Sequence, residues 1–517
     1  MRGFMECGGL PPLFRRPTPP IGRAEQPFPR SSPARLARFA VSILLFSPFL
    51  LSCSPPRQPV FAITHVTVID MTGAAPLSDQ TVIIEKQRIS DLGPSNNVAI
   101  PTGAQILDAH GKFLIPGLAD MHVHLTSAGE PDGSRKFIVP LLLANGITSV
   151  RDMGGYLDSI LPLRKEIAEG KRLGPTIIAP GPYLDGSPPS FQPSLVVTTQ
   201  AQADEDVHQL VARGVDFIKV QSILSRDAYF AIAQAAHREH IVFVGHVPDR
   251  VTAADAADAG QHSIEHLTNV LRGCSRDESK LMREQFFITA KQQSPRQSRA
   301  RESRWLNRLL DAYSPEAAAA LIAKFKEKDV WQTPTLVLLK NDAFPTLENV
   351  APSDARTSFI PARTLDTWKK SRTEQMKTVS PQDSELHAKL LRKSLDLVAQ
   401  MQKAGVKILA GTDAPAPYVF PGSSLHDELQ LLVEAGLTPL EALQSATKSP
   451  AEFLHTAKDS GTVAKGKFAD LVLLDANPLD DIRNTRKIHA VILRGKLLDR
   501  ATFDQLLADA KSFAASH

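Results

Sequence analysis

The chain has 517 residues, of which 43% are apolar and 22% are charged, so it is long enough to bury a large core. Its formal net charge is +4, but residues 1–52 hold seven Arg and two Glu, a net of +5, which leaves about −1 for the remainder. A nearly neutral body offers no basic surface, so we expect no nucleic-acid partner.

The N-terminal segment, residues 1–53, has the pattern of a targeting signal. It is rich in Pro and Arg up to residue 38, continues with the apolar run 39–51 and ends at Cys53. The run is too short for a confident membrane-spanning helix, and Leu50-Leu51-Ser52-Cys53 resembles a bacterial lipoprotein signal. This resemblance implies lipidation at Cys53 and a protein of the bacterial cell envelope, periplasmic or surface-facing, that meets the membrane only through its anchor. An ordinary secretory signal and a buried apolar run stay open.

Cysteine is rare in this chain. Cys7, Cys53 and Cys274 are the three present. Lipidation of Cys53 and loss of the segment before it would leave Cys274 alone, so we expect no intramolecular disulfide and no metal site built from cysteine.

Short β-type runs lie toward both ends of the chain. Residues 57–112 contain runs such as 60–70, punctuated by Gly and Pro, and residues 460–503 have the same character, for example at 490–495. Similar strands on both sides of a different pattern predict one small β-sandwich domain formed from both termini.

The middle of the chain, residues 113–459, alternates strand patterns with helix patterns. Regular alternation of this kind implies a parallel sheet, and eight units in this length predict an α/β fold of the (β/α)8 barrel type. The predicted strands are 113–118, 147–151, 176–180, 216–220, 241–246, 263–266, 333–339 and 408–412.

Two stretches interrupt this alternation. Residues 275–313 are highly charged, and residues 340–385 are polar and contain Pro. We expect solvated helices and loops after the sixth and seventh strands. Loops at the carboxyl ends of barrel strands surround the active site, so the insertions either cover a pocket or decorate the surface; the sequence leaves both open.

Side chains of metal-ligand type follow several of the predicted strands. His122 and His124 end the first one, and side chains two apart on a strand point the same way, so both imidazoles can reach one ion. Each later candidate has an ordinary explanation when taken alone, as a core histidine, an ion-pair partner or a helix cap. Their occurrence in order at matching strand ends favours a metal site. The later candidates are Lys219, His246, His266 and Asp413.

With these residues the chain resembles the amidohydrolase superfamily, and more closely its imidazolonepropionase-like and Xaa-Pro-dipeptidase-like branch, over roughly residues 60–500. The resemblance implies a (β/α)8 barrel with a β-sandwich made from both termini, in agreement with the patterns above. The motifs that carry it are Ile115-Pro-Gly-Leu-Ala-Asp-Met-His-Val-His124, Thr148-Ser-Val-Arg-Asp-Met-Gly154, Phe217-Ile-Lys219, His262-Ser-Ile-Glu-His266, Gly411-Thr-Asp413 and Gly466-Lys-Phe-Ala-Asp-Leu-Val472.

The resemblance also implies how a metal centre is built. In binuclear members the lysine of the fourth strand is carboxylated and bridges two divalent ions. The carboxyl group is needed because a plain ammonium has no lone pair to offer. For this chain the resemblance implies two zinc ions. One ion would take His122, His124, carboxylated Lys219 and Asp413, and the other would take Lys219, His246 and His266. With unmodified lysine, a mononuclear site of His122, His124, His246 and Asp413 remains.

The expected function is that of a metal-dependent hydrolase that cleaves a C–N bond of a small molecule, an amide, peptide or cyclic amide, with metal-activated hydroxide and Asp413 as proton carrier. A mononuclear imidazolonepropionase-like hydrolase or deaminase is one alternative, and a non-catalytic ligand-binding envelope lipoprotein is another. The oligomeric state, including a homo-oligomer, is open.

The substrate is not defined by these motifs. Dipeptidase-like relatives often have His-Ala-Tyr after the fifth strand, whereas this chain has His246-Val-Pro-Asp249, which puts a preference for a free carboxylate in doubt. Arg151 either binds an anion or braces loops. Tyr183 is a candidate pocket residue, and His426 is expected to lie behind the site or on the surface.

Overall fold

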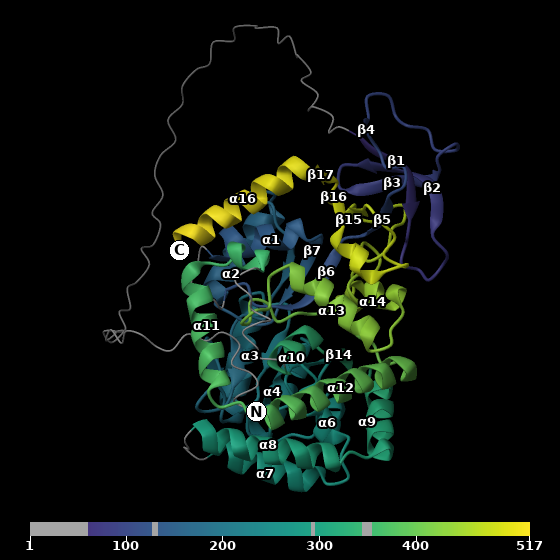
Figure 1. Cartoon of the computed structure of the whole chain (residues 1–517). Helices are drawn as coiled ribbons and strands as arrows, with labels where there is room; N and C mark the ends of the chain where they lie inside the picture. The colour runs from purple at the N-terminus through teal and green to yellow at the C-terminus, as the bar shows by residue number, and fades with distance from the viewer. Residues whose placement is uncertain (1–59, 127–132, 291–294, 344–353) are drawn as a thin grey trace, which may run out of the picture. The chain divides into compact units, whose positions relative to one another are not determined.

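The structure is a computed structural model, and it describes residues 60–126, 133–290, 295–343 and 354–517 (Figure 1). The predicted signal at residues 1–53, with Cys53, lies outside these residues, so both remain predictions. No helix in the described ranges is long and apolar enough to cross a membrane.

Strands from both ends of the chain form one eight-stranded sheet, seen in Figure 1 where purple N-terminal strands meet yellow C-terminal ones. Its order is β17-β16-β15-β5-β1-β2-β3, and β4 pairs with β1. Apolar residues from both termini, such as Ile63, Leu114 and Leu471, pack in its core. Strands from the two ends of the chain thus share one sheet, whereas the small β-sandwich domain stays a prediction. The strands are β1 (Phe61–Val68), β2 (Leu77–Glu85), β3 (Arg88–Pro94), β4 (Gln105–Asp108), β5 (Phe113–Pro116), β15 (Leu471–Leu474), β16 (Ile488–Leu493) and β17 (Lys496–Leu498).

The middle of the chain forms two parallel sheets. One has the order β6-β7-β8, and the other has the order β10-β9-β11-β12-β13-β14. Most of these strands are buried, as expected for parallel strands covered on both faces. The fold is therefore mixed α/β, with parallel strands as predicted. The strands are β6 (Leu118–Val123), β7 (Ile147–Asp152), β8 (Thr176–Ile178), β9 (Tyr183–Asp185), β10 (Ser194–Val196), β11 (Ile218–Val220), β12 (Phe243–Gly245), β13 (Ser263–Glu265) and β14 (Trp331–Thr333).

Helices follow most of these strands and place their apolar faces on them. Several begin with side-chain caps: Thr199 and Thr438 each form a capping box with the residue three positions later. The helix start predicted from Thr438-Pro-Leu-Glu441 is thus confirmed. These helices are α1 (Val139–Ala144), α2 (Leu157–Ala168), α3 (Gln200–Ala212), α4 (Arg226–Arg238), α5 (Ala253–Asp258), α6 (Val270–Gly273), α9 (Pro315–Glu327), α12 (Pro381–Ala404), α13 (Ser423–Glu434), α14 (Pro439–Ser445), α15 (Lys448–Phe453) and α16 (Arg500–Ser516).

The predicted first strand, 113–118, is wrong in its bounds, because the chain changes sheets within it. β5 ends at Pro116, which has no N–H to donate, and β6 begins at Leu118. A Cβ on Gly117 would lie 2.1 Å from the Thr148 hydroxyl oxygen, so only glycine fits between the two sheets. The two histidines therefore lie at the end of β6, His122 within it and His124 directly after it, and not in the preceding strand.

The predicted seventh and eighth strands also differ from the structure. β14 ends at Thr333, and α10 (Leu336–Ala343) replaces the rest of the predicted strand because the Glu428 carboxylate accepts the N–H of Val337 near the helix start. The segment 408–412 makes only an isolated bridge, at Ile408, within the described chain. Its neighbourhood nevertheless hydrogen-bonds to β14 on one side and to β6 on the other.

The charged insertion at 275–313 forms helices with an apolar cluster. It contains α7 (Glu278–Ala290) and α8 (Pro295–Asp311), and Trp305 and Leu306 pack with Leu281 in a small core of their own. The polar insertion contributes η3 (Ala355–Phe359) and α11 (Ala362–Met376). Whether either insertion covers a pocket stays a prediction.

Candidate metal centre

All six predicted ligand residues lie at the carboxyl ends of the parallel strands or in the segment beside them. His122 lies near the end of β6, Lys219 lies in β11, and His124, His246 and His266 directly follow β6, β12 and β13. Each of the six residues is at most 8% exposed. Ionisable groups are costly to bury without partners, so a cluster of this kind needs a specific reason.

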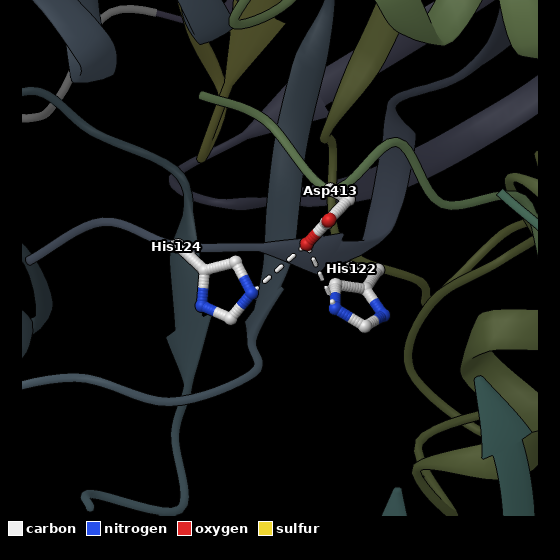
Figure 2. A group of neighbouring side chains, drawn as sticks. All are labelled: His122, His124 and Asp413. Carbon is white, nitrogen blue, oxygen red and sulfur yellow. Dashed lines mark ion pairs between the residues drawn. The ribbon is translucent and has the colours of Figure 1, made fainter. Parts of the chain in front are cut away.

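Three of these residues form a close group, here called the Asp413 group: His122, His124 and Asp413. The Oδ1 atom of Asp413 lies 3.2 Å from His122 Nε2 and 2.9 Å from His124 Nε2 (Figure 2). One ligand atom from each residue lies within 4.8 Å of the other two. The prediction that residues two apart on the strand share one face is therefore confirmed for the two histidines.

The Asp413 carboxylate is held ionised. Burial alone would raise its pKa, but hydrogen bonds and charge from His122, with a further hydrogen bond from His124, hold the pKa well below its usual range. Its backbone N–H donates to the carbonyl oxygen of His122 at 2.7 Å, which keeps the carboxylate beside β6.

The other three residues, here called the Lys219 group, are Lys219, His246 and His266. The ring centroids of the two histidines lie 5.1 Å apart, and His266 lies 4.4 Å from the ring of His122. Burial, with the positive charge of Lys219 adding to it, lowers the pKa of His246 well below its usual value. Both imidazoles are therefore neutral, because burial lowers the pKa of His266 in the same way. A neutral imidazole is the form that binds metals.

Gly245 makes room for the Lys219 side chain. A Cβ at this position would lie 3.0 Å from Lys219 Cδ and 2.2 Å from the carbonyl oxygen of Val220, and its φ of +134° disfavours other residues. Sequence reasoning did not single out this glycine, although it stands directly before His246.

Every histidine in the two groups is anchored through Nδ1. His122 Nδ1 lies 2.9 Å from Glu265 Oε2, and His124 Nδ1 lies 3.0 Å from the carbonyl oxygen of Gly154. His246 Nδ1 lies 2.8 Å from the Ser222 hydroxyl, and His266 Nδ1 lies 2.7 Å from the Thr335 hydroxyl. Anchoring one ring nitrogen on the protein sets the ring orientation and leaves Nε2 for a ligand, which is the usual arrangement around metal-binding histidines.

Glu265 is a site residue that the sequence reasoning missed. It is fully buried and accepts two hydrogen bonds from Arg151 Nη2, at 3.0 and 2.9 Å, besides contacting His122. Burial opposes its ionisation, but the Arg151 charge and the contact with His122 hold its pKa well below the usual range. A signal was present, because Ser263 and Glu265 alternate on a strand that is otherwise apolar.

Arg151 braces strands and does not face a ligand. It is fully buried, and it donates to the Met121 carbonyl at 2.7 Å and to the Ser263 hydroxyl at 3.0 Å as well as to Glu265. Of the two roles left open for it, the structure favours the bracing role, since its donors are directed at strands β6 and β13.

The two remaining candidates, Tyr183 and His426, lie in different parts of the structure. The Tyr183 hydroxyl lies 3.1 Å from His124 Nδ1 and 3.3 Å from the Gly154 carbonyl, so Tyr183 reaches the Asp413 group, and its place in a pocket stays a prediction. His426 is buried, its Nδ1 lies 2.9 Å from the Thr485 hydroxyl, and burial lowers its pKa to about 3. It links α13 to the short helix η4 (Ile482–Arg486).

The Asp413 group fits a divalent metal ion. Around a tetrahedral zinc ion with bonds of about 2.0–2.1 Å, neighbouring ligand atoms lie about 3.3 Å apart. The two Nε2-to-Oδ1 distances, 3.2 and 2.9 Å, are close to this spacing. The donor set, two imidazoles and one carboxylate, is also one that zinc and its neighbours accept.

Several known proteins resemble this chain in sequence or in fold. The model of the amidohydrolase family matches residues 113–498. The ochratoxinase of Aspergillus niger is 41% identical over 91 residues, which are 17% of this chain and 18% of that protein, so the match spans less than a fifth of the relative's length. The structure of a prolidase-like protein from Bifidobacterium longum covers 88% of this chain and 100% of its own, with 25% identity and a TM-score of 0.62. The bottromycin amidohydrolase structure covers 89% of this chain and 91% of its own, with 22% identity and a TM-score of 0.69.

Proposed function

This chain belongs to the amidohydrolase family and is a hydrolase that acts on C–N bonds, and we propose that it cleaves an amide, peptide or cyclic amide bond of a small molecule with the help of bound divalent metal ions. The observation that carries the proposal is the shared anchoring of four buried histidines. All four hold Nδ1 on the protein, and the Nε2 atoms of two of them converge on one carboxylate oxygen.

Two ions are proposed. His122, His124 and Asp413 would hold one together with a carboxylated Lys219, and His246 and His266 would hold the other with the same lysine. Carboxylation gives the lysine an anionic group with two oxygens, and the electrostatic effect of Lys219 on His246 and His266 supports this use. When bound, the ions, proposed to be zinc, would lower the pKa of a coordinated water and polarise the scissile carbonyl.

Asp413 carries the proton in this proposal. Its carboxylate is ionised and buried, so it can accept the proton that the attacking water loses and deliver it to the leaving amine. Tyr183 and Glu265 keep the two β6 histidines in place, through the Gly154 carbonyl and through His122 Nδ1. Burial of the cluster keeps bulk water from screening these charges.

The architecture supports placing these residues at a barrel mouth. We propose that the two parallel sheets form one (β/α)8 barrel, closed where Met121 N–H donates to Ala410 and Asp216 N–H donates to Ala179. The ligand residues would then lie at the carboxyl ends of its strands, the usual place for the active site. A lipid anchor at Cys53, with a location in the bacterial cell envelope, completes the proposal.

A mononuclear hydrolase or deaminase is the second candidate. The observation that favours it is that the close ligand group in the described chain comprises His122, His124 and Asp413, three of the four residues of the mononuclear site. The amount of bound metal separates the two candidates, because the first requires about two ions per chain and the second requires one.

The test combines metal analysis with a substrate screen. Protein purified from zinc-supplemented cells is analysed for metal content and assayed against dipeptides, N-acyl amino acids and lactams before and after chelation. We expect hydrolysis of at least one class, its loss on chelation and its return with zinc. Full activity in protein shown to be metal-free would contradict the proposal.

A further inference from the structure

A cavity lies at the opposite end of the parallel strands from the metal centre. Its volume is about 480 Å³, within the usual range for sites that bind small molecules. Ala119, Ser149 and Thr176, at or near the amino ends of β6, β7 and β8, contribute to its wall, as does Phe217 just before β11. The ligand residues of the centre lie toward the carboxyl ends of the same set of strands, so the cavity is a separate place in the fold.

Aromatic rings and hydroxyl groups line this cavity. Phe217, Phe453 and Phe468 come from the parallel strands, α15 and the segment before β15, respectively. Ser149 and Thr176 face each other across β7 and β8, and neither side chain has a hydrogen bond within the described ranges. The cavity therefore offers aromatic side chains together with hydroxyls that can still donate and accept.

The carboxylates in the lining are already engaged. Asp216 pairs with Arg164 at 2.6 Å, Asp459 pairs with Arg88 at 2.7 Å, and Asp470 accepts the backbone N–H of Arg494 at 2.6 Å. The remaining ionisable lining residue, His455, is exposed to solvent. A charged ligand would have to leave water without a matching partner, which is costly, so the cavity suits an uncharged one.

We propose that this cavity is an accessory binding site for an uncharged small molecule with a planar aromatic ring, and that its occupancy is coupled to the metal centre. The ring of the ligand would lie among the three phenylalanines, and one or two polar groups would meet the free hydroxyls of β7 and β8.

The coupling has a continuous physical path. The rings of Phe453 and Phe217 line the cavity, and the guanidinium of Arg151 lies 4.9 Å from the first ring centroid and 5.9 Å from the second. Arg151 in turn holds Glu265, which contacts His122 Nδ1 at 2.9 Å. A ligand that shifts Phe453 therefore changes the support of one predicted metal ligand. This half of the inference rests on the proposed function, whereas the binding site itself does not.

The test uses indole as the uncharged probe, with indole-3-carboxylate and tryptamine as its charged counterparts. Binding to the whole protein is measured by calorimetry, in metal-free and zinc-loaded samples. We expect indole to bind metal-free protein, and both charged compounds to bind at least about tenfold more weakly, as the cost of burying an unpaired charge requires. Because coupling is reciprocal, zinc and indole should change each other's affinity by the same factor.

Ser149→Trp fills the cavity and should abolish indole binding. Ser78→Trp is the matched control, since Ser78 is an exposed serine of strand β2 away from the cavity, and it should bind like the parent. Thr462→Trp, at the rim, serves as a second filling variant if the first does not fold.

The outcomes separate the two halves of the inference. Failure of indole to bind, or equal binding to the parent and to folded filling variants, overturns the site. Binding that is lost on filling but is independent of zinc supports the site and overturns the coupling. If the protein binds no zinc at all, the proposed function is contradicted. The indole titration of metal-free protein then still tests the cavity as a binding site.

Discussion

The Asp413 group and the Lys219 group hold their histidines in different ways. In the first, Nδ1 meets a carboxylate and a carbonyl, Glu265 and Gly154, which can only accept. In the second, Nδ1 meets the hydroxyls of Ser222 and Thr335, which can donate or accept. Obligate acceptors require the proton on Nδ1 and so fix Nε2 as the ligand atom, whereas hydroxyls leave the tautomer open.

The protein alone therefore forms the Asp413 half of the centre. The Lys219 half needs a chemical change before it can hold a metal ion. The Asp413 group already has the spacing of a metal site. The Lys219 group contains a lysine whose positive charge lowers the pKa of both of its histidines, and that charge would also repel a cation. Carboxylation of Lys219 would reverse the sign of this charge.

The largest expected effect comes from Asp413→Asn, which breaks the Asp413 group at its centre. The amide cannot take up the proton from water, so kcat should fall by about 10²–10⁴-fold while KM changes much less. Steady-state kinetics with metal content measured in parallel checks this. Asp396→Asn, on the solvent side of α12, is the control, and near-normal turnover in Asp413→Asn would refute the proton-carrier role.

Arg151→Met tests the support behind His122. It leaves Glu265 as a buried carboxylate without its cation, and breaking such a pair typically costs about 3–5 kcal/mol in the free energy of unfolding. Urea denaturation of metal-free protein measures the loss. Arg164→Met is the matched control, because the Arg164–Asp216 pair is partly exposed and should cost about 1 kcal/mol or less. If both variants lose the same free energy of unfolding, the buried Arg151–Glu265 pair contributes no more to stability than the partly exposed Arg164–Asp216 pair.

Lys219→Ala separates the two groups directly. The Lys219 group should lose its metal while the Asp413 group keeps one, so the content should fall from about two ions per chain to about one, with a loss of about 10²-fold in kcat. Metal analysis and kinetics check this against Lys403→Ala, an exposed lysine of α12. Two ions per chain in the folded variant would rule out a bridging lysine.

The smallest effect concerns Glu428, which accepts the Val337 N–H and so helps to set the start of α10, just after the Thr335 that anchors His266. Burial raises the pKa of Glu428 to about 8, whereas a carboxyl of the unfolded chain has a pKa of about 4.3. The folded chain thus holds an extra proton between these values, and this contribution to stability is lost as pH rises toward 8.

Glu428→Gln removes that titration and still offers an oxygen to the helix. Relative to the parent, its free energy of unfolding should gain about 1–3 kcal/mol between pH 5 and pH 8. Denaturation at both pH values measures the gain, and Glu434→Gln, at the exposed end of the same helix, should show no such gain. An unchanged pH slope in Glu428→Gln would contradict the assignment.

Local patterns were sufficient for much of the fold and of the centre. The spacing of His122 and His124 places both on one face of a strand because side chains alternate, and the structure confirms it. The alternation of strands and helices predicted parallel strands, and the capping box at Thr438 predicted a helix start. These features depend on residues that are near one another in the chain, so the sequence alone can show them.

What the sequence could not decide depends on contacts between distant segments. The break at Gly117 follows from the approach of Thr148, and the helical turn after Thr333 depends on a carboxylate from Glu428. The bracing role of Arg151 likewise requires Glu265, which is 114 residues away. The sequence by itself determined which chemical groups are present and in what order; only the tertiary structure decided which of them meet, because partner choice across a buried core is settled by packing and by the cost of an unpaired charge.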